Sequence, residues 1–352
     1  MKKLNNFTLF SLTSLGVFII LELYIRFSAI EAPSNTDIDP KIGRVRKPNA
    51  EFVFFNEGFA MGRFNNYGFL GEDIELKKPD SVYRIALLGD SYVEGLYALG
   101  YQHFSYHLKN GLDKLLPGKK VEILNFGRSG FDLSDMYAYD NNFAMKFQPD
   151  LTVYFLSKYD LLPINKDPLV PQVRLNQDEI VIDTTFRNTS KYKLFNTIKP
   201  VLHNSATLQL IRNSINLISS GKYEKILLDK LYAASPDTTD ILKNQLADSI
   251  IFQQSVSQAI LRELNSRESV LFINRDYVSW SPELLAWSGI EPSRYNDMSS
   301  LFTDLMRNGI DPAYWEATNQ NGHWNLKVQE RVGQFLMKKI ITESTEKHEL
   351  AG

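Results

Sequence analysis

The stretch "YRIALLGDSYVEGLY", residues 83–97, decides the fold. A mostly apolar run that enters Gly-Asp-Ser is typical of a buried strand that ends in a turn and is followed by a helix. Such a turn projects the hydroxyl of Ser91 from the sheet, and the free N–H groups of the helix start face a developing negative charge. Gly89 permits a tight turn, and Asp90 is the predicted cap of the helix. Ser91 is therefore either a nucleophile or a polar residue of an ordinary turn, because three common residues do not decide between the two.

The same pattern continues along the chain as strands that alternate with amphipathic helices. Strands are predicted at 82–88, 120–126, 149–156 and 269–274. Helices are predicted at 101–116, 133–147, 249–265 and 325–342. This alternation predicts an α/β fold with a central parallel sheet. Ligands of such sheets bind outside the carboxyl ends of the strands, which is where Ser91 lies.

Other segments do not follow the alternation. Residues 162–247 exceed any ordinary connection, so they are predicted to be a largely helical insertion. It is expected to hold a hairpin around 176–178 and helices at 206–218 and 223–234. The remaining parts are predicted to be an anchor at 1–30, a linker or extended arm at 31–64, the α/β domain at 65–341 and a polar tail at 342–352.

The N-terminus is predicted to be a single-pass membrane anchor. Leu4 to Leu21 are 18 residues without a charge, and a helix over residues 4–25 would be roughly 30 Å long, the thickness of a bilayer core. Glu22 interrupts the apolar run near one end, where a charge costs less. A cleaved signal peptide and a buried core helix are the competing interpretations. Basic residues on both sides leave the orientation open.

The composition excludes several classes of function. The chain has 39 basic and 41 acidic side chains and a formal net charge of −2, so no basic surplus favours nucleic acid as a partner. There is no cysteine, which excludes disulfides, thiolate metal sites and cysteine nucleophiles. His103 and His107 are spaced for one helix face, but no acidic signature surrounds them, and no metal site is predicted.

A serine nucleophile needs a base, and the chain has five histidines. His323 lies in "TNQNGHWNLKV", directly before the last predicted helix, from which a loop can return to the carboxyl ends of the strands. His203 lies in the insertion and His348 in the polar tail. His323 is therefore the predicted base.

Four blocks in this order, "RIALLGDSYVEG", "ILNFGRSGFD", "PDLTVYFLSKYDL" and "GHWN", resemble those of the SGNH/GDSL hydrolase superfamily, and of its bacterial membrane-anchored branch in particular. The resemblance covers the core outside the insertion. It implies a three-layer, flavodoxin-like sandwich and an esterase, lipase or O-acetyltransferase that needs no metal or organic cofactor. It also implies that Ser91 is the nucleophile, that the backbone N–H groups of Ser91 and Gly130 form part of the oxyanion hole, and that His323 is the base.

Two positions depart from the family pattern. The third block normally supplies an Asn to the oxyanion hole, whereas this chain has Tyr159 there and keeps the following Asp160. The last block normally has an Asp two or three residues before the histidine, whereas this chain has Gln320 and Asn321. A tyrosine hydroxyl can replace the Asn as a donor. The histidine could be oriented by a backbone carbonyl or Asn321, or by another acid, for which the candidates are Asp304, Asp311 and Glu316.

Two functions follow from these observations. The first is a serine ester hydrolase or O-acyl transferase. The family resemblance implies that it is anchored in the bacterial inner membrane with its domain outside the cytoplasm, and that it acts on an ester-bearing small molecule or an acetylated glycan. The second is a catalytically weakened domain that binds a glycan or a partner protein in the same cleft. The run "YWEATNQNGHWN" suits sugar stacking through Trp315 and Trp324, although both could equally pack the core.

Overall fold

The computed structural model describes residues 5–28, 35–54, 56–115, 118–163, 167–219 and 248–350. The chain divides into two compact units. The N-terminal unit comprises residues 1–35 and 187–241, and the α/β unit comprises residues 36–186 and 242–352. The division shows that the N-terminal segment shares its contacts with the central part of the chain.

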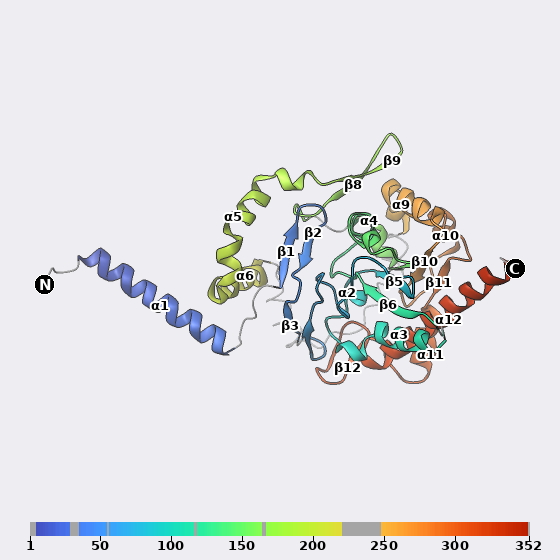
Figure 1. The fold of residues 1–352 in the computed structure, drawn as a ribbon, viewed down its shortest axis with the longest axis horizontal. Helices are drawn as coiled ribbons and strands as arrows, with labels where there is room; N and C mark the ends of the chain where they lie inside the picture. The colour runs from blue at the N-terminus through green and yellow to red at the C-terminus, as the bar shows by residue number, and fades with distance from the viewer. Residues whose placement is uncertain are drawn as a thin grey trace. The chain divides into compact units, whose positions relative to one another are not determined.

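The α/β unit is built on a five-stranded parallel sheet with the order β11-β10-β7-β5-β6 (Figure 1). Its strands are β5 (Val82–Leu88), β6 (Lys120–Asn125), β7 (Leu151–Leu156), β10 (Val270–Asn274) and β11 (Tyr295–Asp297). Numbered along the chain, this order is 2-1-3-4-5, the flavodoxin-like arrangement, whose ligands bind where the order reverses, beside the first strand. The predicted α/β fold with a central parallel sheet is confirmed.

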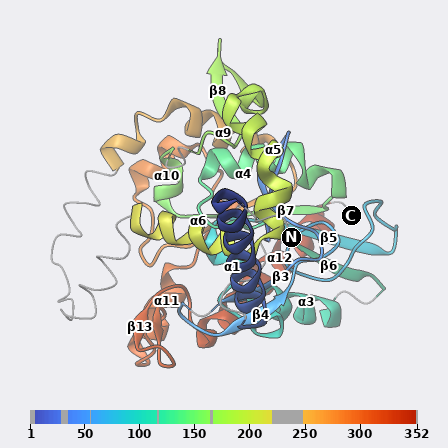
Figure 2. The same ribbon diagram turned by 90° about the vertical axis from the view of Figure 1, so that its left-hand side faces the viewer.

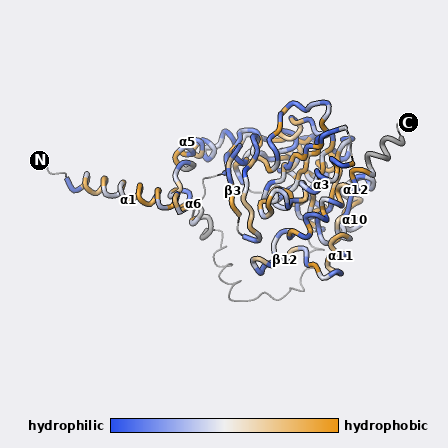
Figure 3. Tube along the Cα trace, turned by 60° about the horizontal axis from the view of Figure 1, so that its bottom comes forward, coloured by the Kyte–Doolittle hydropathy of each residue, from blue (hydrophilic) through white to orange (hydrophobic). Residues whose placement is uncertain are grey.

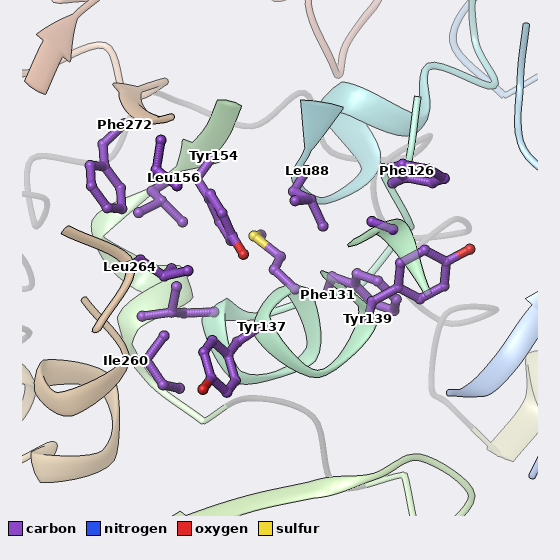
Figure 4. Close-up of a cluster of buried hydrophobic side chains, with 14 of the residues drawn as sticks. Leu88, Phe126, Phe131, Tyr137, Tyr139, Tyr154, Leu156, Ile260, Leu264 and Phe272 are labelled. Carbon is purple, nitrogen blue, oxygen red and sulfur yellow. The ribbon is translucent and has the colours of Figure 1, made fainter. Parts of the chain in front are cut away.

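Helices cover both faces of this sheet, which gives three layers (Figure 2). One face carries α4 (Leu133–Asn142), α9 (Ser255–Ser266) and α10 (Pro282–Ser288). The other face carries α3 (Phe104–Leu115), α11 (Ser299–Arg307) and α12 (Leu326–Leu350). Alternate residues of β5 point to the two faces, with Leu88 in the first core and Leu87 in the second. Figure 4 shows the first core, where Tyr154 and Phe272 of the sheet face Ile260 of α9.

Two hairpins precede the sheet and belong to the α/β unit. They consist of β1 (Thr36–Asp39) with β2 (Gly43–Arg46) and β3 (Glu51–Phe54) with β4 (Ala60–Arg63). Ile42 lies in the core of the unit, and Phe52 packs with Phe64 in a smaller cluster. The prediction of a linker or extended arm at 31–64 is therefore wrong from residue 36 onward. The strands are four residues each and hold scattered charges, so they show no extended alternation.

The predicted insertion is divided between the units. The predicted hairpin exists as β8 (Gln172–Asn176) and β9 (Glu179–Asp183), with both turn residues at positive φ, and it contacts α4 and α9 of the α/β unit. The chain enters the N-terminal unit at residue 187, where α5 (Ser190–Asn204) and α6 (Ala206–Ser219) join α1 (Asn6–Ser28). The helix predicted at 223–234 lies outside the described residues.

Helix α1 has 23 residues and is long and apolar enough to cross a membrane (Figure 3). Within the part of the chain that the structure describes, no other helix meets this test. Ile25 is the one residue of α1 that is buried. A membrane span and a signal sequence both fit this helix.

Some element boundaries differ from the predictions. The helix predicted at 133–147 ends at Asn142 and is followed by a 3₁₀ turn at Ala144–Phe147. The helix predicted at 249–265 is interrupted, because residues 248–251 form one helical turn and α9 begins only at Ser255. Strand β11 was not predicted, because it is only three residues long and reads Tyr-Asn-Asp.

Candidate active site

Ser91 begins the short helix α2 (Ser91–Glu94), directly after β5 and its turn. The carboxylate of Asp90 caps this helix by accepting a hydrogen bond from Tyr92 N at 3.0 Å, as predicted. A Cβ atom at Gly89 would lie 2.4 Å from a methyl carbon of Val93, so only glycine fits this turn without movement. The turn therefore places the Ser91 hydroxyl at the carboxyl end of β5, where the strand order reverses.

His323 lies in the loop between β13 (Gln320–Asn321) and α12. Its Nε2 atom is 2.7 Å from Ser91 Oγ. Its ring stacks on Tyr97, with centroids 4.7 Å apart and planes inclined by 15°, and also contacts Tyr92 at 4.7 Å. Two residues that are far apart in sequence thus meet at hydrogen-bonding distance, and aromatic neighbours restrict the rotation of the ring.

The acid beside His323 is Glu57, at the tip of the β3–β4 hairpin. Its Oε1 and Oε2 atoms lie 2.8 and 2.7 Å from His323 Nδ1, and Oε2 also accepts a hydrogen bond from His323 N at 2.9 Å. Thr318 Oγ1 and Gln320 Nε2 donate to the backbone carbonyls of Glu57 and Asn56, which ties the hairpin tip to the histidine loop. Ser91, His323 and Glu57 therefore form one continuous hydrogen-bonded chain.

Glycine at position 322 makes this approach possible. A Cβ atom there would lie 2.3 Å from Glu57 Cδ and 2.5 Å from Glu57 Cγ. Because Glu57 is buried among groups of the α/β unit, it has little room to retreat. Position 322 must therefore be glycine if the Glu57 carboxylate is to pack against it.

The acids and the amide proposed from sequence lie elsewhere. Asp304 pairs with Arg307, Glu316 pairs with Lys327, and Asp311 accepts from the backbone N–H of Ala313. Asn321 pairs with Tyr314 in the two-stranded β12–β13 ladder, in which β12 is Tyr314–Trp315. All four residues are described, and none of them bonds His323, so these four alternatives are wrong.

Glu57 was missed because the family pattern directs attention to the residues just before the histidine. The acid comes instead from 34 positions before the nucleophile, in "FFNEGFAMG". The one local signal is a single carboxylate among aromatic residues and glycines, in the segment predicted to be a linker or extended arm. Nothing in that signal specifies a partner 266 positions away.

The charges of the site follow from these contacts. Burial acts to raise the pKa of Glu57, but the hydrogen bonds from the ring and backbone of His323 outweigh it and hold the pKa below its usual value. Glu57 is thus an anion at neutral pH, and its carboxylate accepts a hydrogen bond from Nδ1–H of His323. This tautomer leaves Nε2 as the acceptor that faces the Ser91 hydroxyl.

The loop after β6, which holds the second block, is fixed to α2. Arg128 N donates to Gly89 O at 3.0 Å, and Ser129 N donates to Glu94 Oε2 at 2.9 Å. Glu94 is buried and also pairs with Arg46 at 2.7 Å. Gly130 follows with φ at +83°, a conformation that favours glycine. These bonds hold the loop beside the turn that carries the serine, while the oxyanion role of Gly130 stays a prediction.

Tyr159 follows β7 in a 3₁₀ turn at Lys158–Leu161. Its backbone N–H donates to Ser157 Oγ at 3.2 Å, and its ring contacts the ammonium of Lys158. The residue therefore stands at the carboxyl end of the strand beside β5. Its role as an oxyanion donor stays a prediction.

Arg275, directly after β10, links the first and third blocks. Its Nη2 atom lies 2.5 Å from Asp90 Oδ2 and 3.5 Å from Asp160 Oδ1, and its guanidinium lies 4.5 Å from the centre of the Tyr92 ring. Burial raises the pKa of Asp160 to about 8, which Arg275 opposes and Asp90 reinforces. Arg275 was not singled out from sequence, where it is a lone cation after the fourth predicted strand.

Other sequence candidates have structural roles. His103 is buried, and its Nδ1 atom lies 2.7 Å from Ser105 Oγ. Within the described residues, no group of three or more His, Asp or Glu side chains could hold a metal ion. Trp315 and Trp324 are both buried, so they pack the core and present no platform for a sugar.

Comparison with known proteins gives fold neighbours only. No protein-family model and no curated protein matches this chain. A two-domain esterase (CEX) active on acetylated mannans, crystallised with mannopentaose, is 12% identical with a TM-score of 0.39; the match covers 75% of this chain and 50% of that chain. TesA is 10% identical with a TM-score of 0.35, covering 73% and 98% of the two chains. The lipase Lip_vut3 from a goat rumen metagenome is 17% identical with a TM-score of 0.32, covering 73% and 97%.

This chain spans half the length of the mannan esterase. The names of these neighbours include an esterase and a lipase. Identities and TM-scores this low say nothing about function.

Proposed function

We propose that the α/β unit is a serine ester hydrolase or O-acyl transferase of the SGNH/GDSL type. The single observation that carries the proposal is the hydrogen-bonded chain from Ser91 Oγ through His323 to Glu57. A nucleophile, a base and an acid that orients the base are the three groups that acyl transfer by serine requires.

The reaction follows from the positions of these groups. Ser91 Oγ attacks the ester carbonyl while His323 Nε2 accepts its proton, and Glu57 stabilises the imidazolium that forms. The backbone N–H groups of Ser91 and Gly130 stabilise the oxyanion. His323 then gives the proton to the departing alcohol, which leaves an acyl group on Ser91. Water or the hydroxyl of an acceptor, activated by His323, releases that acyl group.

The presence of Glu57 changes the balance between the two functions. In serine proteases, loss of the orienting acid costs about 10⁴ in turnover, and loss of one oxyanion donor costs about 10²–10³. Because Glu57 supplies the acid, only the replacement of the family's oxyanion Asn by Tyr159 still weighs against activity. The binding-module alternative also loses support, because Trp315 and Trp324 are buried. An active enzyme is the function that the geometry favours.

The substrate class and location follow the family resemblance. We propose an ester-bearing small molecule or an acetylated glycan of the cell envelope as substrate, with no cofactor. Helix α1 is proposed as a single-pass anchor in the bacterial inner membrane, with the α/β unit outside the cytoplasm. Membrane extraction at alkaline pH tests the anchor, since release of the full chain into the wash would contradict it.

The test of the chemistry compares matched variants of the full chain in detergent, assayed on a chromogenic acetate ester. Ser91→Ala is expected to abolish turnover, and Glu57→Gln is expected to lower kcat by about 10³–10⁴. Glu316→Gln is the matched control, because this acid was a sequence candidate and pairs with Lys327 instead. It should keep the wild-type rate. Equal rates for wild type and Ser91→Ala would exclude the enzyme, whereas an active Glu57→Gln would leave a Ser-His dyad.

A further inference from the structure

Helices α5 and α6 meet on the side of α1. At their junction, Glu22 of α1 accepts hydrogen bonds from Ser205 Oγ at 2.9 Å, Ala206 N at 2.9 Å and Thr207 N at 3.0 Å. Arg26 pairs with Glu22 at 2.7 Å and donates to the carbonyl of Asn204. The only acidic residue of α1 is thus satisfied by the start of α6, and the contact joins the two helices to the proposed anchor.

The position of Glu22 along α1 sets the depth at which this contact would lie in a bilayer that α1 spans. Glu22 lies six residues before the last residue of α1, Ser28, which corresponds to roughly 9 Å at 1.5 Å per residue. A charge is tolerated near the end of a span, where the headgroups begin. If α1 spans a bilayer, the junction of α5 and α6 therefore lies at the membrane interface.

Both helices expose apolar side chains at helical spacing. On α5, Leu194, Ile198 and Val201 are 61%, 39% and 62% exposed and follow the i, i+4, i+7 pattern of one face. On α6, Ile211 and Ile215 are 50% and 59% exposed and lie four residues apart. Helices of this kind leave a hydrophobic face without a partner in water, although each packs against the rest of the N-terminal unit.

The charges of this segment have one sign. Residues 190–219 hold four cations and no Asp or Glu, in a chain with 39 basic and 41 acidic side chains. The cations are Lys191, Lys193, Lys199 and Arg212. An amphipathic helix with an apolar face and basic flanks is typical of the surface of an anionic bilayer, where long basic side chains reach the headgroups.

We infer that α5 and α6 form a docking surface that lies in the headgroup region of an anionic bilayer, beside the point where α1 leaves it. This inference rests on the proposed membrane anchor. It assigns a role to the helical part of the insertion, which the ester-cleaving site does not use. The occupant of the exposed apolar side chains is lipid, because α6 packs against the helix that is proposed to span lipid and the basic side chains of residues 190–219 are complementary to anionic headgroups.

The absence of cysteine makes a site-specific test possible in the full chain. Single variants Leu15→Cys, Val201→Cys, Ile215→Cys and Asn196→Cys are labelled with a nitroxide. The protein is reconstituted in vesicles of two parts phosphatidylethanolamine to one part phosphatidylglycerol. Position 196 is the matched control, since it is exposed on α5 and lies about 200° around the helix from Leu194. Spin-label collision with oxygen and with a water-soluble nickel chelate then reports depth.

The expected result is that labels at 201 and 215, like the label at 15, collide several-fold more with oxygen than with nickel, while the label at 196 shows the reverse. In pure phosphatidylcholine, immersion at 201 and 215 should decrease and that at 15 should not. If the label at 15 is immersed while 201 and 215 behave like 196, the docking inference is overturned and the anchor stands. If the label at 15 stays in water, the anchor fails and the inference fails with it. Ester hydrolysis by each labelled variant tests the chemistry separately.

Discussion

Glu57 differs from an ordinary surface carboxylate because both of its oxygens face His323, at 2.8 and 2.7 Å from Nδ1. Its pKa lies below the usual value of 4.5 in the folded chain. The unfolded chain therefore binds a proton at a higher pH than the folded chain does. The stability that ionised Glu57 contributes is complete above pH 4.5 and is lost as the pH falls through the lowered folded pKa.

The lowered pKa of Glu57 gives a prediction for the variant Glu57→Gln, which has no carboxylate to titrate at this position. The difference in Tm between wild type and the variant should be constant above the usual pKa and should shrink as the pH falls below it. Thermal unfolding followed by circular dichroism over a series of acidic buffers measures this difference. A difference that does not change with pH would show that Glu57 makes no charged interaction with His323.

The pKa of Asp160 is shifted in the opposite direction to that of Glu57. Burial raises its pKa from 3.8 to about 8, so the folded chain keeps a proton that the unfolded chain releases. Wild-type stability is thus expected to fall as the pH rises from 3.8 to about 8, relative to Asp160→Asn, which mimics the protonated form. The Tm of both proteins at several pH values in this window checks the prediction. A variant that is less stable by the same amount throughout would mean that Asp160 is ionised in the fold.

The β3–β4 hairpin and the histidine loop act as one element because Gly322 packs on Glu57. In Gly322→Ala, the added methyl group would lie 2.3 Å from Glu57 Cδ and must displace the carboxylate. A shift of about 1 Å in a catalytic group can cost about 10² in rate, so kcat should fall by that order. Steady-state kinetics on the acetate ester measures the effect.

Gly100→Ala is the control for that experiment. No heavy atom lies within 4 Å of a Cβ atom at Gly100, and its φ is not positive. The control should keep the wild-type kcat and Tm. If Gly322→Ala is equally active, the Glu57 carboxylate is free to move without loss of function, contrary to the packed arrangement described above.

Sequence periodicity identified the elements that face a large core and missed those that do not. Strand β5 matches its predicted bounds, 82–88, because every residue but Tyr83 is buried and the run is almost continuously apolar. The β1–β4 hairpins bury few residues per strand, and β11 is a three-residue edge strand. A pattern of period two needs more residues than these strands have.

At the scale of the whole molecule, the α/β unit begins at residue 36 and not at residue 65. A chain shortened to begin at Thr36 keeps Glu57, and it is expected to hydrolyse the acetate ester at a rate near that of the full chain. A chain that begins at Asn65 loses the acid and the apolar residues Ile42 and Phe52. It should be inactive and less stable. Activity in the shorter chain would show that the hairpins are dispensable.

Ser91 and His323 could be predicted from the sequence because each lies next to a strong local signal. Ser91 follows a buried strand, and His323 precedes the last amphipathic helix. The sheet order came from the resemblance to a family and not from periodicity. Glu57 could not be predicted, because its role depends on a contact across 266 positions, and neither end of that contact marks the other. Long-range side-chain pairing is a property of the assembled fold and leaves no regular pattern in the chain.

The three groups of the hydrogen-bonded chain enter the polypeptide at residues 57, 91 and 323 of 352. Synthesis proceeds from the N-terminus, so the acid and the nucleophile leave the ribosome long before the base. Until residue 323 is made, Ser91 has no imidazole to accept its proton and Glu57 has none to orient. If the proposed reaction depends on the hydrogen-bonded chain, a nascent chain shorter than 323 residues lacks the base that this reaction requires.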